Sequence, residues 1–589
     1  MPGVLLVLVA TALFFGLWWN RVLAPNGAGD LEGLTSLNAG LLPYRDYFFQ
    51  SPPGIFLLWL PIAPLCANNM AAIAFAGVMT RIALVLALYG ACRTFAGPLV
   101  SAGASVAACL LAATAFADTP QYYNQLTSGI AGLICLTWAL QARVRSPAIG
   151  LAGAVLTGLL TGLNLLLKQT TGGLVLAVIV ALAVGDGWLT RRPGWVMRLG
   201  AICLGIGLAL GAGILWLVGH GLLGASLDAS FVSGPAAKGS LLSVLLRPVS
   251  NVLTWYLLPE NLVATGICVA LRSLRPGTDL RGAPVGLVLI GLGLACGIVF
   301  GQLTNAVVLG SAGIAFFGTL LAMFEEGWAT WRAPTAARTD PFLRTGLFAI
   351  AAASAYGLEI SWMFCEMVIP GFAFYVAWCL SDVGVPVQVE ARDARRRWRL
   401  VGLAGLAGLA VLSVERKVTA PFVWAYWEEP PLYAARGASH LPALAGMNLS
   451  RETARFYDDV TDAITSHSRP GETLLVYPHM PVFYTLADRR PVGHAIVHWF
   501  DTCPDALALS EAEKLRAAPP PVVVAMVLPP EVYDVGEALY RNGRRSGQRD
   551  LWATIEEITA GYELVYEHPA PGSGFPIRVW ARPGSAQPK

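Results

Sequence analysis

Apolar runs of bilayer-crossing length recur from Gly3 to about Leu412 and constrain the fold more than any other feature of the chain. A helix needs roughly 20 apolar residues to cross a hydrocarbon core of about 30 Å. Only 13% of the residues are charged, whereas about one quarter are charged in ordinary soluble domains. These observations predict a polytopic α-helical membrane protein.

The runs predict about thirteen membrane-spanning helices, with ends defined to within several residues. They cover residues 3–20, 71–92, 97–116, 126–141, 148–167, 170–188, 198–219, 250–271, 283–301, 308–324, 343–358, 360–380 and 398–414.

Arginines are concentrated in every second loop between these runs. If the N-terminus is cytoplasmic, the cytoplasmic loops hold Arg93, Arg143, Arg145, Arg191, Arg192, Arg198, Arg272, Arg275, Arg281, Arg332, Arg338, Arg344, Arg392, Arg395, Arg396, Arg397 and Arg399. The opposite loops before the C-terminal region hold only Arg21, Arg45, Lys168, Lys238 and Arg247. Basic residues favour cytoplasmic loops. The pattern therefore predicts that the loop 21–70, the loop around 220–249 and the C-terminal region lie on the outer face.

The apolar stretch Gly54–Ala67 is too short to be counted as a span. It follows Pro52 and Pro53, and Pro61 and Pro64 interrupt it. Proline removes a backbone donor and kinks a helix. We expect this stretch to lie along the outer leaflet or to dip into it without crossing.

The composition changes at about Val414, which divides the chain into a transmembrane domain, 1–414, and a soluble α/β domain, 415–589. The alternation of apolar residues predicts strands at 473–477, 522–527, 563–567 and 577–581 and helices at 451–466, 508–517 and 530–541. Trp424, Tyr426 and Trp427 follow the last span, where aromatic belts form. Cys503 is the only cysteine of this region, and His479, His494 and His498 have no standard metal spacing. No cofactor is indicated; a divalent metal is compatible with the sequence without being indicated by it.

The first outer loop holds the most informative motif, GLLPYRDYFFQSPPG at Gly40–Gly54. An acidic residue after the first span, then PYRD and a Pro-Pro entering an apolar helix, resembles the GT-C superfamily of glycosyltransferases. The resemblance is to the bacterial branch that contains protein mannosyltransferases and the lipid A aminoarabinose transferase. Arg81, Lys168 and the segment 476–491 are weaker echoes of it.

The resemblance implies transfer of a hexosyl or pentosyl group, with inversion, from a polyprenyl-phosphate carrier at the outer face of a bacterial inner membrane. Its partners would be that donor, a lipid, glycan or protein acceptor, and membrane lipids, with no nucleic acid. In such enzymes a carboxylate of this loop removes a proton from the acceptor, and cations stabilise the departing phosphate.

Carried onto this chain, the resemblance makes Asp30 the first candidate for the catalytic base and Glu32 the second. Asp30 could instead cap a helix, and Glu32 could be solvated. Asp30 lies thirteen residues before Pro43, closer than the family pattern. Gln50 and Ser51 replace the charged residue usual before the Pro-Pro, and Asn124 and Gln125 stand where a second acidic residue is usual.

Arg45, Lys168 and Arg247 are the candidate ligands of the donor phosphate. Arg45 could equally pair with Asp46, which together with Pro52 and Pro53 would structure the loop. Lys168 could extend to lipid headgroups, and Arg247 could belong to an ordinary interfacial loop.

Two alternatives remain open on sequence grounds. One is a multipass transporter or flippase, although the chain shows none of the repeated halves that are common in transporters. The other is a catalytically silent scaffold with the same fold.

Overall fold

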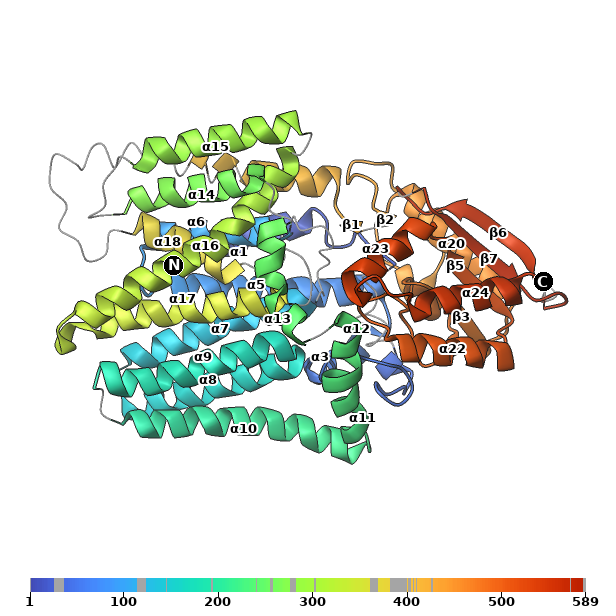
Figure 1. Cartoon of the computed structure of the whole chain (residues 1–589), viewed down its shortest axis with the longest axis horizontal. Helices are drawn as coiled ribbons and strands as arrows, with labels where there is room; N and C mark the ends of the chain where they lie inside the picture. Colours follow the sequence, from blue (N-terminus) through green and yellow to red (C-terminus); the bar gives the residue numbers. More distant parts are fainter. Residues whose placement is uncertain are drawn as a thin grey trace.

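The computed structural model shows a mostly helical chain with a small mixed β-sheet near its C-terminus (Figure 1). The structure describes residues 2–25, 36–113, 123–144, 146–191, 194–239, 241–254, 258–275, 282–300, 303–360, 369–381, 400, 404–405, 407–408, 410–424, 427–572 and 574–585.

Five described helices are long and apolar enough to cross a membrane: α5 (Met70–Cys92), α8 (Pro147–Leu167), α9 (Gln169–Leu189), α10 (Trp195–Gly219) and α15 (Gly282–Val299). They pack with α1 (Pro2–Gly16), α6 (Pro98–Ala113), α7 (Tyr123–Arg143), α14 (Leu258–Ser273), α16 (Leu303–Arg332), α17 (Thr339–Glu359) and α18 (Ile369–Leu380). Side chains such as Leu215 and Val288 are exposed on these helices, as expected where lipid covers a bundle. A total of thirteen spans stays a prediction.

One predicted span differs from the observed elements, and the short stretch that was not counted as a span forms no long helix. The predicted span 250–271 is wrong at its start, because α13 (Leu241–Thr254) ends there and α14 begins at Leu258. Residues 255–257 are outside the described part, and Pro259 suits the first turn of a new helix. The stretch 54–67 forms the short helices α3 (Gly54–Trp59) and α4 (Ala63–Cys66), neither of which is long enough to cross a bilayer.

The C-terminal sheet has the strand order β4-β3-β5-β7-β6. β3 (Thr473–Tyr477) pairs in parallel with β4 (Arg490–Pro491) and β5 (Val522–Met526), whereas β7 (Pro576–Ala581) runs antiparallel to β5 and to β6 (Glu563–Pro569). The associated helices are α20 (Arg451–Ser466), α21 (Val482–Ala487), α22 (Asp505–Ala517), α23 (Pro530–Arg541) and α24 (Gly547–Thr559). β3 and β5 are almost wholly buried, which suits central strands covered on both faces.

Trp427 corrects one expectation. Its side chain is buried and its ring stacks on Tyr457 at 6.0 Å and packs on Phe456 at 5.3 Å. It therefore belongs to the hydrophobic core beneath α20 and not to an interfacial aromatic belt.

The bundle has two chemically different ends. One faces the C-terminal α/β part, and we call it the domain end: Asn69 Nδ2 donates to the Ala445 carbonyl at 2.8 Å, and Tyr457 Oη donates to the Leu23 carbonyl at 2.6 Å. At the opposite end Arg338 donates to the Leu189 carbonyl and Arg198 pairs with Asp186 at 2.9 Å. The predicted outer loops thus share an end with the C-terminal part, as the alternation of arginines requires.

Glu326 ties four helices together at the arginine end. The Oε1 of this buried carboxylate of α16 accepts from Arg275 beside α14 at 2.9 Å and from Trp378 of α18 at 2.6 Å, and its Oε2 forms an ion pair with Arg344 of α17 at 2.9 Å. A buried carboxylate is tolerated when it is fully paired in this way.

Candidate active site at the domain end

The PYRD motif forms a tight, internally bonded loop. The Asp46 carboxylate accepts from the Leu42 amide at 2.7 Å and from the Arg45 guanidinium at 2.7 Å. Arg45 holds the pKa of Asp46 below its usual range, so Asp46 stays ionised. The buried Tyr44 hydroxyl donates to the Ser51 carbonyl at 2.6 Å, and burial raises the pKa of Tyr44. Asp46 therefore bonds two groups of its own loop, and the side chain of Arg45 is about half exposed.

This loop is fixed between the bundle and the C-terminal part. The Phe48 amide donates to the His494 carbonyl at 2.6 Å. At the other end of the motif, after Pro52 and Pro53, Gly54 starts α3 directly against the turn between α8 and α9. A Cβ added to Gly54 would stand 2.5 Å from the Leu166 carbonyl carbon. Only glycine allows so close an approach. The contact brings the end of the motif against Leu166 and Leu167, which directly precede Lys168 in the sequence.

Lys168 lies at that turn as the residue shared by the end of α8 and the start of α9. Its side chain is 3% exposed, and its Nζ donates to the Asn124 Oδ1 at 2.8 Å. The alternative in which Lys168 extends to lipid headgroups is therefore wrong. Asn124, at the position where an acidic residue was expected, is itself 2% exposed and orients the ammonium inside the protein.

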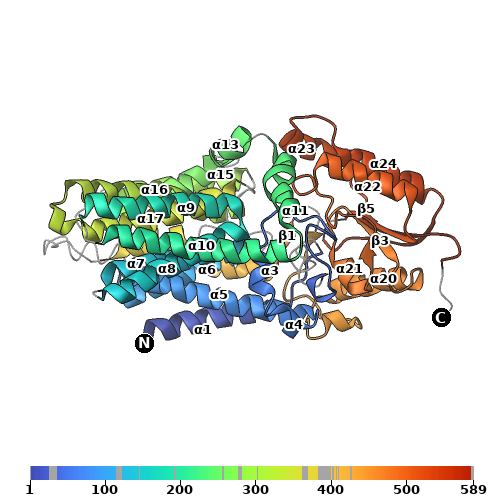
Figure 2. The same cartoon turned by 90° about the horizontal axis from the view of Figure 1, so that it is seen from below.

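A third segment, from α11 (Leu223–Asp228) through the π-helical turn Ala229–Ser233 and α12 (Gly234–Lys238) to α13, closes the same region. Gln169 Nε2 donates to the Ser230 carbonyl at 2.9 Å, and Gly234 packs against the Gln50 backbone. Figures 1 and 2 both show α3 and α11 between the bundle and the C-terminal part. Three segments that are far apart in the sequence thus converge on one junction.

Arg247 of α13 faces the C-terminal part. Its guanidinium donates to the Lys238 carbonyl at 2.6 Å and lies over the Tyr540 ring, 5.6 Å from its centroid. Its predicted role as a phosphate ligand stays a prediction. In this structure its contacts link α13 to α23.

Two residues that the sequence analysis did not select complete this junction. Arg541 is 3% exposed and donates to the Ala237 carbonyl at 2.6 Å and to Asp505 at 2.8 Å. Asp501 is buried nearby; burial raises its pKa, and the positive charges of Lys238, Arg247 and Arg541 oppose that rise. No local signal marks either residue, because Arg541 opens a run of surface arginines and Asp501 follows an ordinary aromatic segment.

The histidines of the C-terminal part do not assemble a metal centre within the described residues. Burial lowers the pKa of His479 to about 3 and also lowers that of His498. Both are neutral at physiological pH, and the His479 ring stacks on Trp499.

The two candidate bases, Asp30 and Glu32, lie in 26–35, outside the described residues. The structure describes the residues on either side of them. Leu23 accepts a hydrogen bond from Tyr457, and the motif begins at Gly40. Their catalytic roles stay predictions.

Comparison with known proteins gives matches among solved structures alone, since no family model and no curated protein matches this chain. The solved structures that match are glycosyltransferases of the GT-C superfamily, which is also the superfamily that the first-loop motif resembles. One is the oligosaccharyltransferase AglB of Archaeoglobus fulgidus in complex with an inhibitory peptide and a dolichol-phosphate, at 13% identity and a TM-score of 0.49, covering 100% of this chain and 75% of AglB. Another is ArnT of Cupriavidus metallidurans in the apo state, at 13% identity and a TM-score of 0.43, covering 100% of this chain and 99% of ArnT. At these identities and scores, similarity alone carries no conclusion about activity.

Proposed function

We propose that the chain is a membrane glycosyltransferase that moves a sugar from a polyprenyl-phosphate donor to an acceptor at the outer face of a bacterial inner membrane. The observation that carries the proposal is the position of the PYRD loop between the helical bundle and the C-terminal part. The motif is clamped between His494 on one side and the Leu166–Leu167 backbone on the other, directly beside the buried Lys168. A rigid loop fixed next to a preorganised cation suits group transfer from a phosphate, which depends on positioning and on electrostatic stabilisation of the leaving group.

In the proposed reaction, Asp30 accepts the proton of the acceptor hydroxyl as that oxygen attacks the anomeric carbon. The bond from the anomeric carbon to the phosphate oxygen breaks at the same time, and the carrier phosphate leaves with its negative charge. One displacement inverts the anomeric centre. In this proposal Lys168, held by Asn124, stabilises the leaving phosphate, and the half-exposed Arg45 offers further donors.

The test varies both the sugar donor and the candidate catalytic base. Purified full-length protein is incubated with a panel of polyprenyl-phosphate sugars, and release of the lipid phosphate is measured. Asp30→Asn keeps the shape and much of the capping ability of the side chain, so it should cost about 1 kcal/mol or less in stability. Loss of a general base should lower transfer on the order of 100- to 10,000-fold.

We expect Asp30→Asn to insert normally and to transfer no detectable sugar, with Glu32→Gln the milder lesion. Retention of more than about a tenth of the activity in Asp30→Asn would transfer the role to Glu32. If the protein releases no lipid phosphate with any donor of the panel, the proposed function is contradicted.

A further inference from the structure

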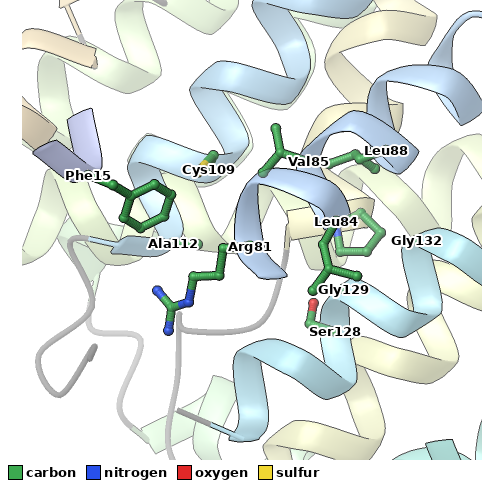
Figure 3. A pocket seen from close by; sticks show the side chains of 11 residues that line it. Phe15, Arg81, Leu84, Val85, Leu88, Cys109, Ala112, Ser128, Gly129 and Gly132 are labelled. Carbon is green, nitrogen blue, oxygen red and sulfur yellow. The ribbon is translucent and has the colours of Figure 1, made fainter. Parts of the chain in front are cut away.

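A pocket opens at the arginine end of the bundle, between α7, α9, α10 and α17. It is separate from the pocket around Phe15 and Arg81 (Figure 3), and among the described residues the two share no lining residue. It holds about 420 Å³ of empty space, part of it continuous with the outside. That volume is within the range of about 300–1,000 Å³ that is usual for sites of small molecules.

Each of the four helices contributes one polar residue to this pocket. They are Gln141 of α7, Asp186 of α9, Arg198 of α10 and Thr339 of α17. α7 and α9 end at Arg143 and Leu189, and α10 and α17 begin at Trp195 and Thr339, so all four residues lie within about one turn of a helix end. A helix of roughly 20 residues crosses the hydrocarbon core. The polar residues are therefore at the level of lipid head groups.

An apolar layer lies directly beneath the polar one. Three or four residues away on the same helices, toward the middle of the bundle, the lining consists of Trp138, Ala183, Ile202 and Phe342. Residues at this spacing share one face of a helix, and one turn rises about 5.4 Å. The pocket thus changes from polar to apolar over one helical turn, as a lipid leaflet does from head group to acyl chain.

Gln141 indicates that the pocket takes a polar ligand. Its side chain is 5% exposed, and among the described residues neither its Nε2 nor its Oε1 has a hydrogen-bond partner. A Cβ added to Gly153 of α8 would stand 3.3 Å from Gln141 Cβ, so α8 closes the site behind this residue. A buried amide normally bonds at both ends, because desolvation without a hydrogen bond is costly. A group that both donates and accepts would satisfy it.

The ion pair between Asp186 and Arg198 determines the charge that the ligand should carry. Arg198 Nη2 is 2.9 Å from Asp186 Oδ2, and the Thr190 hydroxyl donates to Asp186 Oδ1 at 2.8 Å. Both charged side chains are mostly buried, so their charges are only partly screened by water. Together they attract a ligand that carries both signs, whereas an anionic ligand is attracted by Arg198 and repelled by Asp186.

The surface beside the pocket is apolar. Val184 and Trp188 of α9 and Val196 and Met197 of α10 are exposed. Lipid covers such a surface in a membrane protein, and tryptophan is typical of the head-group level. A lipid of the leaflet at the arginine end is therefore the ligand that these surroundings supply.

We infer that the pocket binds one phospholipid whose head group carries both a phosphate and a primary ammonium, as phosphatidylethanolamine does. The phosphate faces Arg198, and the ammonium donates to Asp186. Gln141 donates from Nε2 to the phosphate and accepts at Oε1 from the ammonium, which satisfies both ends of the amide. The start of an acyl chain packs on the apolar layer. The inference does not use the proposed function, because the pocket and the junction are at opposite ends of the bundle.

The test measures phospholipid binding without any sugar donor. Full-length protein in detergent, freed of bound lipid, is titrated with phosphatidylethanolamine, phosphatidylcholine and phosphatidylglycerol of the same acyl chains. A fourth ligand, glycerophosphoethanolamine, has the head group alone. Native mass spectrometry and thermal stabilisation follow the binding. We expect phosphatidylethanolamine to bind at least about tenfold more tightly than the other three ligands.

Phosphatidylcholine carries the same charges, but its quaternary ammonium has no N–H to donate, whereas a primary ammonium has three. Equal binding of the three lipids would show ordinary lipid contact only. Equal binding of glycerophosphoethanolamine would show that the apolar layer is not part of the site. Either result overturns the inference.

Gln141→Leu removes the amide and keeps a side chain of similar size. Without phospholipid this variant should melt at the wild-type temperature or higher, because an unsatisfied buried amide is gone. Its affinity for phosphatidylethanolamine should fall about tenfold or more. Leu140→Ala, at the exposed neighbouring position of α7, is the control and should keep the wild-type affinity. Equal affinities of the wild type and Gln141→Leu would refute the site.

Asp186→Asn tests the choice of head group. It removes the negative charge and keeps the shape of the side chain, so the preference for phosphatidylethanolamine over phosphatidylglycerol should disappear. The melting temperature without lipid shows whether the variant is folded. A folded Asp186→Asn protein that keeps the wild-type preference would contradict the inference.

Discussion

At the scale of single residues, the junction is defined by polar groups buried inside the protein. Lys168 was visible in the sequence as one cation among apolar residues, but its partner Asn124 is 44 positions away and could not be read from the pattern. Desolvation is what makes such groups effective, since electrostatic interactions strengthen as water is excluded. The same desolvation makes a buried carboxylate costly to ionise.

Glu429 illustrates that cost and gives a pH prediction. It is fully buried, accepts from Thr453 Oγ1 at 2.9 Å and from Trp427 Nε1 at 3.3 Å, and burial raises its pKa to about 8. Its folded pKa lies above its unfolded value, so the native state binds more protons between about pH 4.5 and pH 8. The protein should lose stability as the pH rises through that window.

Glu429→Gln should flatten this dependence and raise the melting temperature at pH 8 relative to the wild type. A shift of one pKa unit corresponds to about 1.4 kcal/mol, so the difference should reach the order of a few kcal/mol. Glu428→Gln, at the exposed neighbouring position, is the matched control. Melting curves at half-unit pH steps measure the effect, and parallel curves for the wild type and Glu429→Gln would show that burial does not perturb this carboxyl.

At the scale of elements, short connections position the site more than the long helices do. The start of α3 packs against the backbone at the end of α8, Gly234 packs against the Gln50 backbone, and Gln169 at the start of α9 donates to the Ser230 carbonyl. Backbone contacts tolerate little displacement, because no rotamer change can relieve a collision between main-chain atoms.

Gly54→Ala should therefore push α3 away from the Leu166–Leu167 backbone. We expect transfer to fall at least about tenfold and stability to fall by roughly 1–3 kcal/mol, the usual cost of overpacking. Gly173→Ala in α9 is the control, because an added Cβ meets nothing there. It should be neutral or stabilising by up to about 1 kcal/mol through helix propensity. Melting temperature and lipid-phosphate release are measured for both variants. Equal values for Gly54→Ala and Gly173→Ala would contradict the proposed contact between the loop and the end of α8.

At the scale of the whole molecule, the two ends of the bundle differ: one end is rich in arginine, and the other contacts the C-terminal part. Arg198, Arg275, Arg338 and Arg344 lie at one end, while the loops that contact the C-terminal part lie at the other. The structure shows which loops share an end of the bundle. The excess of arginine predicts that the arginine end faces the cytoplasm.

Single cysteines test that direction in intact cells once the native cysteines are removed. Arg332→Cys, at the exposed last residue of α16, should be shielded from membrane-impermeant thiol reagents, and Glu557→Cys, exposed on α24, should be labelled. Permeabilised cells should show labelling at both positions. Labelling of Arg332→Cys in intact cells would invert the predicted topology.

The elements of the fold were largely predictable from local pattern. The predicted helices 451–466 and 530–541 and the predicted strand 473–477 coincide with α20, α23 and β3, because each has a clear apolar period bounded by turn residues. α24 was not predicted, although its Leu551, Ile555 and Ile558 recur at helical spacing.

The sequence by itself determined the apolar helices, the strands, the two chemically different ends and the motif of the first loop, because each is written in neighbouring residues. Only the tertiary structure decided that Trp427 is core, that Lys168 points inward to Asn124, and that Arg541 reaches the carbonyl of Ala237. The physical reason is that burial and partnership depend on contacts between segments tens to hundreds of residues apart, and no local period encodes them.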